Sequence, residues 1–207
     1  MALYFGVGVL VSALLYPEGF SMLTVYISYL GGKEENPTGY WVYNTCAFLT
    51  GILLIPQGIY TYRRLTPTMK VVSFIGCLAM IEGSIGFALI GIWYQGTPGE
   101  GHAITTWMAF GGFGIAAVFL LISLIGKRIQ KYGWPKVWQL FLIYGQLFAI
   151  LIVAEIFNNH EYLFDGLGLD PGFFKDKFWE WWYMFTVIFW LIGMAIITPE
   201  SSKKLVE

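Results

Sequence analysis

Few side chains in this sequence are suited to chemistry, and His102 is one of only two histidines in the chain. Helical spacing places His102, Thr105 and Thr106 on one helix face, close to a predicted outer membrane boundary. An imidazole that meets carboxylates can carry out general acid–base chemistry. We therefore predict an outward-facing polar pocket, with His102, Glu82 and Glu155 as the candidate catalytic residues. Further acidic and imidazole groups that could ring this pocket are Glu18, Glu100, His160 and Asp165.

Glu82 is a single carboxyl group inside a long apolar run. It follows Lys70 by 12 residues and precedes Gly96 by 14, which puts it roughly 18–20 Å from each helix end. A carboxylate near the bilayer midplane is costly and is usually functional. Three roles stay open: a neutral acid that pins two helices together, a contact to a lipid headgroup or substrate, and proton or ion coupling. Residues predicted at a similar depth, which could share a hydrogen bond with it, are Thr50, Ser84, Tyr144 and Gln146.

No metal site and no cofactor are expected. With two histidines, no HExxH motif and no close histidine pair, a zinc site would depend on carboxylates. The loop from Asp165 to Asp170 resembles a loose calcium loop, but it lacks the alternating acids of an EF-hand. The sequence also contains no Gly-x-Ser-x-Gly motif, no P-loop and no haem-attachment motif. Familiar hydrolase, nucleotide-binding and haem chemistry are therefore disfavoured.

The elements that must position these residues are membrane-spanning helices. Hydrophobic residues make up 57% of the chain and charged residues only 12%, whereas soluble domains have about a quarter of their residues charged. This composition predicts an all-α integral membrane protein with a single helical domain over residues 1–207. Apolar runs suited to about 30 Å of hydrocarbon predict a bundle of about six spans, the first of them marginal in length. The expected spans are residues 2–16, 41–62, 71–94, 102–126, 137–157 and 179–197, with an interfacial segment at about 18–30 and an outer loop at 158–178.

Charge placement predicts the orientation of this bundle. Nine of the 12 Lys and Arg residues fall on one side of the predicted spans. An excess of positive charge marks the cytoplasmic side, so both termini are expected inside and the glutamate-rich segments outside. We expect a multi-pass protein of the cytoplasmic (plasma) membrane, and the lack of a strongly basic face argues against nucleic acid as a partner. The nine basic residues are Arg63, Arg64, Lys70, Lys127, Arg128, Lys131, Lys136, Lys203 and Lys204.

Small residues predict where the helices approach one another closely. Three pairs, each four residues apart, put two small side chains on one helix face: Ala79 with Gly83, Gly112 with Ala116, and Gly145 with Ala149. Such faces allow helix backbones to come close together in lipid. The third, fourth and fifth spans are therefore expected to form a tight core, unless the glycines only reflect their general frequency in membrane helices.

The two cysteines are expected to stay unpaired. Cys46 is predicted in the outer half of the membrane and Cys77 in the inner half. A disulfide requires Cα atoms within roughly 7 Å of each other, which this separation excludes.

Several short motifs carry a family resemblance. The sequence Ser-Tyr-Leu-Gly at 28–31 follows a short first span, Asn36-Pro37 and Asn44 come next, Gly51 lies within the second span, and Gly-Glu-Gly-His-Ala at 99–103 precedes Phe110. This pattern resembles the six-span Frag/DRAM/Sfk-type membrane proteins and their prokaryotic relatives in domain-of-unknown-function family 998, from about residue 2 to residue 197. The resemblance implies a link to lipid remodelling, lipid asymmetry or autophagy for the eukaryotic branch.

By motif position, the resemblance carries Ser28, Gly31, Asn44 and His102 over as an outer-face cluster. Glu82 and Glu155 match no position of the family pattern, and the acidic loop at 158–177 departs from it.

Three functions follow as hypotheses. The first is a polytopic membrane protein whose outward-facing pocket binds lipid or a partner protein, as a homo-oligomer or an accessory subunit of a larger membrane assembly. The second is a membrane-embedded lipid-modifying enzyme that uses His102 with Glu82 or Glu155, so enzymatic activity stays open. The third is a proton-coupled transporter that uses Glu82, which the absence of matched interrupted helices disfavours. The predicted ligand-binding residues are Ser28, Asn44, Glu82, His102, Thr105, Thr106, Gln146 and Glu155.

Overall fold

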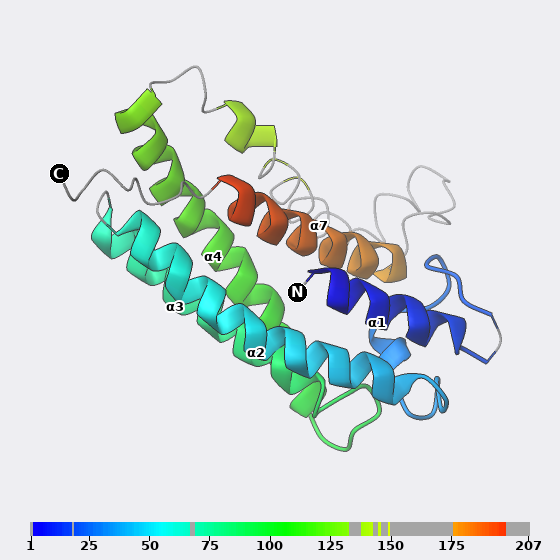
Figure 1. Ribbon diagram of the computed structural model, residues 1–207. Helices are drawn as coiled ribbons and strands as arrows, with labels where there is room; N and C mark the ends of the chain where they lie inside the picture. The colour runs from blue at the N-terminus through cyan, green and yellow to red at the C-terminus, as the bar shows by residue number, and fades with distance from the viewer. Residues whose placement is uncertain are drawn as a thin grey trace, which may run out of the picture.

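The computed structural model describes residues 2–17, 19–66, 69–132, 138–142, 145, 149 and 176–197. Every regular element in these residues is helical, so the chain is all-α, as predicted. Figure 1 shows the helices packed side by side, with α1 alongside one half of α2 only and the N-terminus near the middle of the bundle. The elements are α1 (Ala2–Leu14), the short 3-10 helix η1 (Ser28–Gly31), α2 (Tyr40–Leu65), α3 (Lys70–Ile90), α4 (Gly101–Tyr132) and α7 (Asp176–Ile197).

Three of the described helices are long and apolar enough to cross a membrane: Tyr40–Leu65, Lys70–Ile90 and Gly101–Lys127. Helix α1 has 13 residues, which corresponds to about 20 Å and falls short of about 30 Å of hydrocarbon. The apolar part of α7, Glu180–Ala195, is also shorter than a full span. The chain is thus a multi-pass membrane protein by its three long helices. The predicted span at 137–157 lies mostly outside the described residues.

The helices α3 and α4 pack with almost no space between their backbones. A β-carbon built on Gly83 of α3 would lie 2.9 Å from the backbone nitrogen of Phe113 in α4. A β-carbon on Gly112 of α4 would lie 2.8 Å from the carbonyl oxygen of Ala79 and would also meet the backbone of Gly83. Since real β-carbons do not come this close to backbone atoms, both positions require glycine. The small-residue faces predicted on these two helices therefore form the contact, whereas Gly145 has no neighbour that close.

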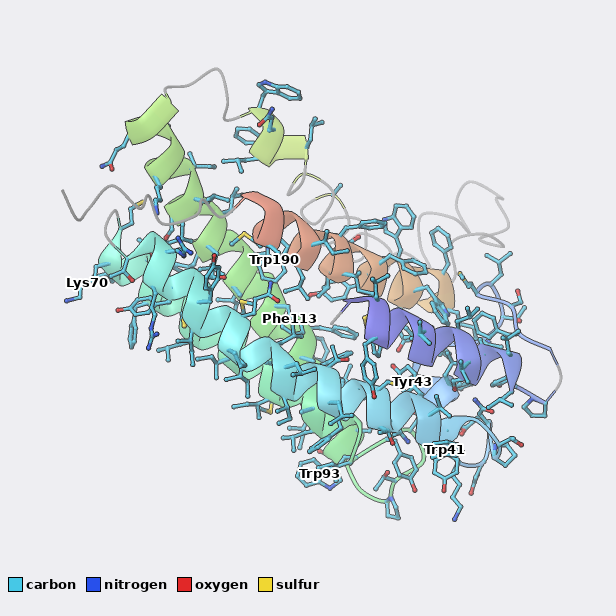
Figure 2. All side chains as sticks on the ribbon, viewed as in Figure 1. Trp41, Tyr43, Lys70, Trp93, Phe113 and Trp190 are labelled. Carbon is cyan, nitrogen blue, oxygen red and sulfur yellow. The ribbon has the colours of Figure 1, made fainter. Side chains whose placement is uncertain are left out.

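The two ends of the bundle differ in chemistry. At one end, the Lys127 ammonium of α4 donates a hydrogen bond to the carbonyl oxygen of Arg64, the residue that precedes the last residue of α2. Figure 2 shows Lys70 at this basic end and both Trp41 and Trp93 toward the opposite end. The structure thus brings basic residues from three helices to one end.

The opposite end is covered by residues 19–39, here called the cap. Asn36 of the cap and Ser12 of α1 are both fully buried, and their hydrogen bonds tie the cap to α1. The Asn36 Nδ2 lies 2.9 Å from the Ser12 hydroxyl and 3.1 Å from the carbonyl oxygens of Ser12 and Leu30. The Asn36 Oδ1 accepts from the backbone N–H of Gly39 at 3.0 Å, and the Ser12 hydroxyl donates to Leu30 or Gly39. A buried polar cluster therefore fixes the cap to the helices.

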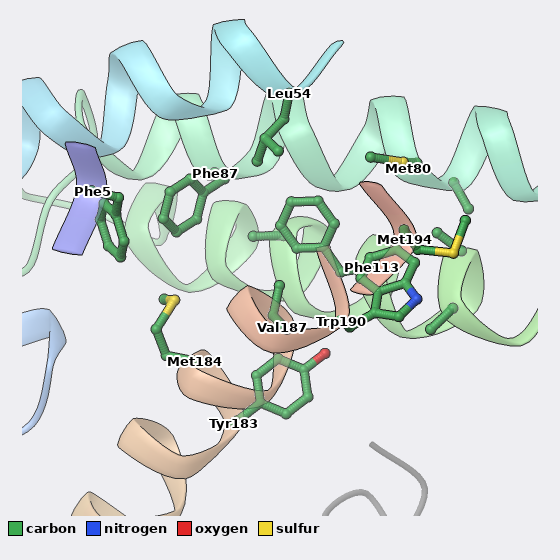
Figure 3. Close-up of a cluster of buried hydrophobic side chains, with 14 of the residues drawn as sticks. Phe5, Leu54, Met80, Phe87, Phe113, Tyr183, Met184, Val187, Trp190 and Met194 are labelled. Atoms are coloured by element: carbon green, nitrogen blue, oxygen red, sulfur yellow. The ribbon is translucent and has the colours of Figure 1, made fainter. Parts of the chain in front are cut away.

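The hydrophobic core is built around a row of aromatic rings. The ring centroids of Phe5 and Phe87 are 5.0 Å apart, those of Phe87 and Phe113 are 6.3 Å apart, and those of Phe113 and Trp190 are 6.5 Å apart. These distances fit tilted and edge-to-face aromatic packing. Figure 3 shows this row facing Val187 of α7. The row links α1, α3, α4 and α7 in one core.

Both cysteines are free and buried, as expected from the sequence. The Cys77 thiol donates to the carbonyl oxygen of Gly58 at 3.5 Å. Cys46 packs against α1, where a β-carbon on Gly8 would collide with its side chain. Neither thiol can react with a reagent in solution until the helices separate.

Candidate functional site

A cleft of about 580 Å³ opens at the cap end of the bundle. The cap, the loop between α3 and α4, the first turns of α4 and the start of α7 each contribute to its wall. Its lining mixes aromatic rings with hydroxyl, amide, imidazole and carboxyl groups: Tyr26, Ser28, Tyr29, Gln95, His102, Ala103, Thr106, Trp107, Phe110 and Glu180. This is the kind of concave, mixed surface that ligands favour.

Helix α7 holds the cap in place through three side chains in its first two turns, each bonded to a backbone group of the cap. The Lys177 ammonium donates to the carbonyl oxygen of Thr24 at 2.8 Å, and the Trp181 indole N–H donates to that of Val25 at 2.8 Å. Between them, the Glu180 Oε2 accepts from the backbone N–H of Ile27 at 3.0 Å. The same carboxyl group also interacts with the hydroxyl and backbone N–H of Ser28, at the start of η1. Carboxylates stabilise helix N-termini in this way, so Glu180 is both a cap anchor and a cleft wall.

His102 is oriented by the loop that precedes α4. Its Nδ1 lies 3.0 Å from the carbonyl oxygen of Trp93. Because a carbonyl oxygen can only accept, this contact assigns the proton of the neutral ring to Nδ1 and leaves Nε2 as an acceptor. Nearby, the buried hydroxyl oxygen of Thr106 has no hydrogen-bond partner in the described residues. The cleft therefore offers one hydrogen-bond acceptor at its α4 wall, and the unpaired Thr106 hydroxyl lies buried behind that wall.

A second cavity, of about 410 Å³, lies deeper in the bundle. Its walls are apolar side chains of α1, α2, α3, α4 and α7, including the core residues Phe87, Phe113 and Val187. Two of its lining residues, Leu3 of α1 and Ile192 of α7, are also exposed on the bundle surface. The cavity therefore reaches the surface of the bundle beside Leu3 of α1 and Ile192 of α7.

Two polar side chains of α2 interrupt the apolar wall of this cavity. Thr50 is 5% exposed, and its hydroxyl oxygen has no hydrogen-bond partner among the described residues. The Gln57 amide nitrogen lies 3.4 Å from the carbonyl oxygen of Leu191 in α7. An unpaired buried hydroxyl costs about 1–3 kcal/mol, so Thr50 is a weak point of the packing.

Phe110 of α4 lines both the cleft and the apolar cavity. Its ring centroid lies 4.6 Å from that of Tyr183, and its carbonyl oxygen accepts from the Tyr183 hydroxyl at 2.7 Å. This side chain therefore forms the boundary between the polar and apolar spaces, and α7 fixes its position.

The structure brings Ser28, His102 and Thr106 of the predicted ligand-binding set together in the cleft. Asn44 is buried outside it and donates from Nδ2 to the carbonyl oxygen of Gly31 at 2.9 Å, so it holds η1 against α2. Thr105 is buried, and its hydroxyl donates within its own helix to Gly101 at 2.9 Å or to His102 at 3.1 Å.

Glu82 lies away from both cavities, exposed on an otherwise apolar face of α3. Its predicted hydrogen bonds to Thr50 and Ser84 are not formed, because Ser84 donates to Met80 at 2.6 Å and Thr50 has no partner in the described part of the chain. Helical periodicity explains the difference, since Gly83 and Ser84 turn toward the bundle and leave Glu82 outside. Glu100, also predicted to ring the pocket, is exposed and does not line the cleft. The other predicted residues lie outside the described residues: Gln146, Glu155, Tyr144, Glu18, His160 and Asp165.

Sequence reasoning missed Glu180, the carboxyl group that does line the cleft with His102. The available signal was an acid within the aromatic run at 179–182, near a predicted outer boundary. It also missed Tyr26 and Tyr29 of the cap as cleft residues, since both were expected on the membrane surface. No group of three or more His, Cys, Asp and Glu side chains suited to a metal ion occurs within the described ranges.

Comparison with known proteins places the chain in a family. A family model described as "Protein of unknown function (DUF998)" matches residues 1–197. The searches of curated proteins and of solved structures each returned no match. Since the family model spans nearly the whole chain, including the cap, the long helices and α7, this protein belongs to the DUF998 family of proteins of unknown function.

Proposed function

We propose that this protein binds one membrane lipid, with the polar headgroup in the cleft and an acyl chain in the apolar cavity. The cleft volume of about 580 Å³ and the cavity volume of about 410 Å³ are both in the range of small-molecule sites. The cleft carries hydrogen-bonding groups and the cavity carries almost none, which matches the two halves of an amphipathic molecule.

Phe110 is the single observation that carries this proposal. Because Phe110 lines both spaces, the cleft and the cavity meet at this residue, and a molecule that occupied both would pass its side chain. The opening beside Leu3 and Ile192 supports entry from the hydrocarbon layer. An opening on the lipid-facing side of the bundle favours a membrane lipid over a water-soluble ligand.

Native mass spectrometry of the protein released from membranes in mild detergent tests the proposal. The wild-type protein is expected to retain lipid. Val187→Phe fills part of the cavity from α7 and should reduce lipid retention severalfold, whereas Phe189→Trp, on the exposed face of the same helix, should not. A wild-type protein that carries no lipid, or equal retention in both variants, would refute the proposal.

We further propose that the chain crosses the plasma membrane six times, with both termini in the cytoplasm. The basic end, formed by Arg64, Lys70 and Lys127, supports this orientation. In a protein without Cys46 and Cys77, a membrane-impermeant maleimide on intact cells should label Lys33→Cys in the cap and not Arg63→Cys. Labelling in the reverse pattern would overturn the orientation.

We also propose kinship with the Frag/DRAM/Sfk-type proteins. The hydrogen bond between Asn44 and Gly31 supports it, because two motif residues of the resemblance meet at η1. An experimental structure of a Frag-type protein should contain the same asparagine–glycine contact between its second helix and its outer loop. A different partner for that asparagine would count against kinship.

A lipid-modifying enzyme is the second candidate function, and the orientation of His102 favours it. The Nε2 acceptor lies in a cleft with the Glu180 carboxyl group, an arrangement suited to a general base. Thin-layer chromatography of a fluorescent phospholipid incubated with the protein in liposomes would detect turnover. Turnover that His102→Gln abolishes would support the enzyme, and turnover that survives this change would exclude His102 as the base.

The position of Glu82 supports a partner protein for α3. A carboxyl group on a lipid-facing helix is costly, and neighbouring residues such as Leu78 and Ile85 are exposed with it. Assembly of this chain with itself or within a larger complex would cover the group. Glu82→Gln should then alter the assembly size on native gels; an unchanged size in gentle detergent would argue against a partner at this face.

A further inference from the structure

We propose that the cleft recognises a positively charged ammonium group on the lipid headgroup. The inference rests on the proposed lipid-binding function and adds the headgroup chemistry. It is argued from the charge, the aromatic rings and the hydrogen bonds of the cleft wall.

The charge balance of the cleft is the first argument. Glu180 is the acidic residue in its lining, and no Lys or Arg belongs to that lining among the described residues. The neighbouring Lys177 donates to the carbonyl oxygen of Thr24, so its ammonium group is directed at the cap backbone. A phosphate or carboxylate alone would therefore meet the Glu180 carboxyl group, and the neighbouring Lys177 ammonium is already engaged with the Thr24 carbonyl oxygen and the Tyr26 ring. A cationic ligand would instead favour the ionised form of Glu180.

Aromatic rings supply the second argument. Tyr26 and Tyr29 pack edge-to-face with ring centroids 5.1 Å apart, and both line the cleft. Trp107 lines the same space from α4 and is 77% exposed, although it is a large apolar side chain. Ring faces attract ammonium groups, tryptophan most strongly. The Lys177 ammonium already lies 5.2 Å from the centroid of the Tyr26 ring, so Tyr26 holds the protein's own cation and Trp107 is the ring that would meet the ammonium group of a ligand.

Hydrogen-bonding groups around the rings can take the rest of the headgroup. Gln95 offers an amide in the cleft wall, and the Nε2 of His102 offers an acceptor in the same wall. These groups suit a neutral hydroxyl or one phosphate oxygen of a zwitterionic headgroup. The ammonium group, in contrast, would lie in the part of the cleft that Glu180 and Trp107 line.

A conservative change separates charge recognition from the structural role of Glu180. Glu180→Gln keeps a side-chain oxygen that can accept from the backbone N–H of Ile27, so the cap stays anchored. It removes the negative charge and replaces one acceptor oxygen by an amide group, so the contact to Ser28 weakens while Lys177 and Trp181 still hold the cap. Glu34→Gln is the matched control, because it makes the same change at an exposed position of the cap that does not line the cleft.

The experiment reconstitutes the protein in nanodiscs with equal amounts of phosphatidylethanolamine and phosphatidylglycerol, and measures retained lipid by native mass spectrometry. The wild-type protein and Glu34→Gln are expected to retain the ethanolamine lipid about five- to tenfold over the glycerol lipid. In Glu180→Gln the ratio should fall close to one, and Trp107→Leu should lower it partway. Free ethanolamine added at millimolar concentration distinguishes the source: competition indicates that the amine alone suffices, and no competition indicates that the lipid chain is required.

The outcomes separate this inference from the function on which it rests. Retention of both lipids without preference, or an unchanged preference in Glu180→Gln, overturns ammonium recognition and leaves lipid binding standing. Retention of neither lipid refutes lipid binding itself. If Glu180→Gln unfolds, the preference in Trp107→Leu decides, since Trp107 is exposed and its replacement disturbs little packing.

Discussion

Replacing Asn36 by alanine should release the cap from the helices. The Asn36 side chain is fully buried, and its amide nitrogen lies within 3.1 Å of three acceptors, two on Ser12 and one on Leu30. An amide nitrogen has two protons, so two of these three contacts are full hydrogen bonds at any time. Its oxygen accepts one more from Gly39 at 3.0 Å. Alanine therefore removes three buried hydrogen bonds, while the Leu30 carbonyl oxygen can still accept from Ser12 and the Gly39 N–H still donates to the Asn36 carbonyl oxygen.

The magnitude follows from that count. At about 1 kcal/mol of net stability for each hydrogen bond, Asn36→Ala should cost about 3 kcal/mol. For a chain of this size, such a loss lowers Tm by roughly 6–12 °C. Thr38→Ala, on an exposed residue two positions away, should cost less than about 0.5 kcal/mol.

The buried free cysteines provide the assay. Cys46 and Cys77 are shielded in the folded bundle, so a thiol-reactive fluorophore reports their exposure during heating. Asn36→Ala should advance the labelling transition by the amount given above, while Thr38→Ala should match the wild-type curve. A transition for Asn36→Ala within 2 °C of wild type, a margin well below the roughly 6–12 °C expected, would refute the account of the cap as a buried polar anchor.

Two further predictions concern the core. Gly112→Ala should destabilise the protein by about 2 kcal/mol in the same assay, because its β-carbon would collide with the backbone of Gly83. A β-carbon at Gly111 meets nothing within 4 Å, so Gly111→Ala should be neutral or slightly stabilising. Equal effects of the two changes would contradict the close α3–α4 contact. Thr50→Val removes an unpaired buried hydroxyl and should leave the free energy of unfolding unchanged or raise it by up to about 1 kcal/mol, which the labelling transition reports. A clear loss of stability would mean that the hydroxyl has a partner.

The long helices were predictable because hydrophobic length is a local property of the sequence. The apolar runs at 41–62, 71–94 and 102–126 correspond to α2, α3 and α4, which begin and end within a few residues of them except that α4 extends to Tyr132. Close α3–α4 packing was predictable for the same reason, since Gly83 and Gly112 belong to spaced small-residue pairs.

The cleft was only partly predictable, because its walls come together through tertiary contacts. His102 and Thr106 were identified from residue type and predicted depth, and Ser28 from its motif position in the family resemblance. Glu180 was not, since nothing local indicates that an acid at 180 accepts from the backbone at 27. Glu82, in contrast, was predicted to be a site residue but lies away from both cavities. Depth in the membrane can be counted along a helix, whereas the direction of a side chain depends on which neighbours the helix packs against.

An experimental structure in a lipid nanodisc would test the central claim most directly. The account predicts elongated density that begins in the cleft beside His102 and Glu180, passes Phe110 and continues between Phe87 and Val187 toward the opening near Ile192. Side chains collapsed into both spaces, or lipid density confined to the outer face of α3, would contradict it.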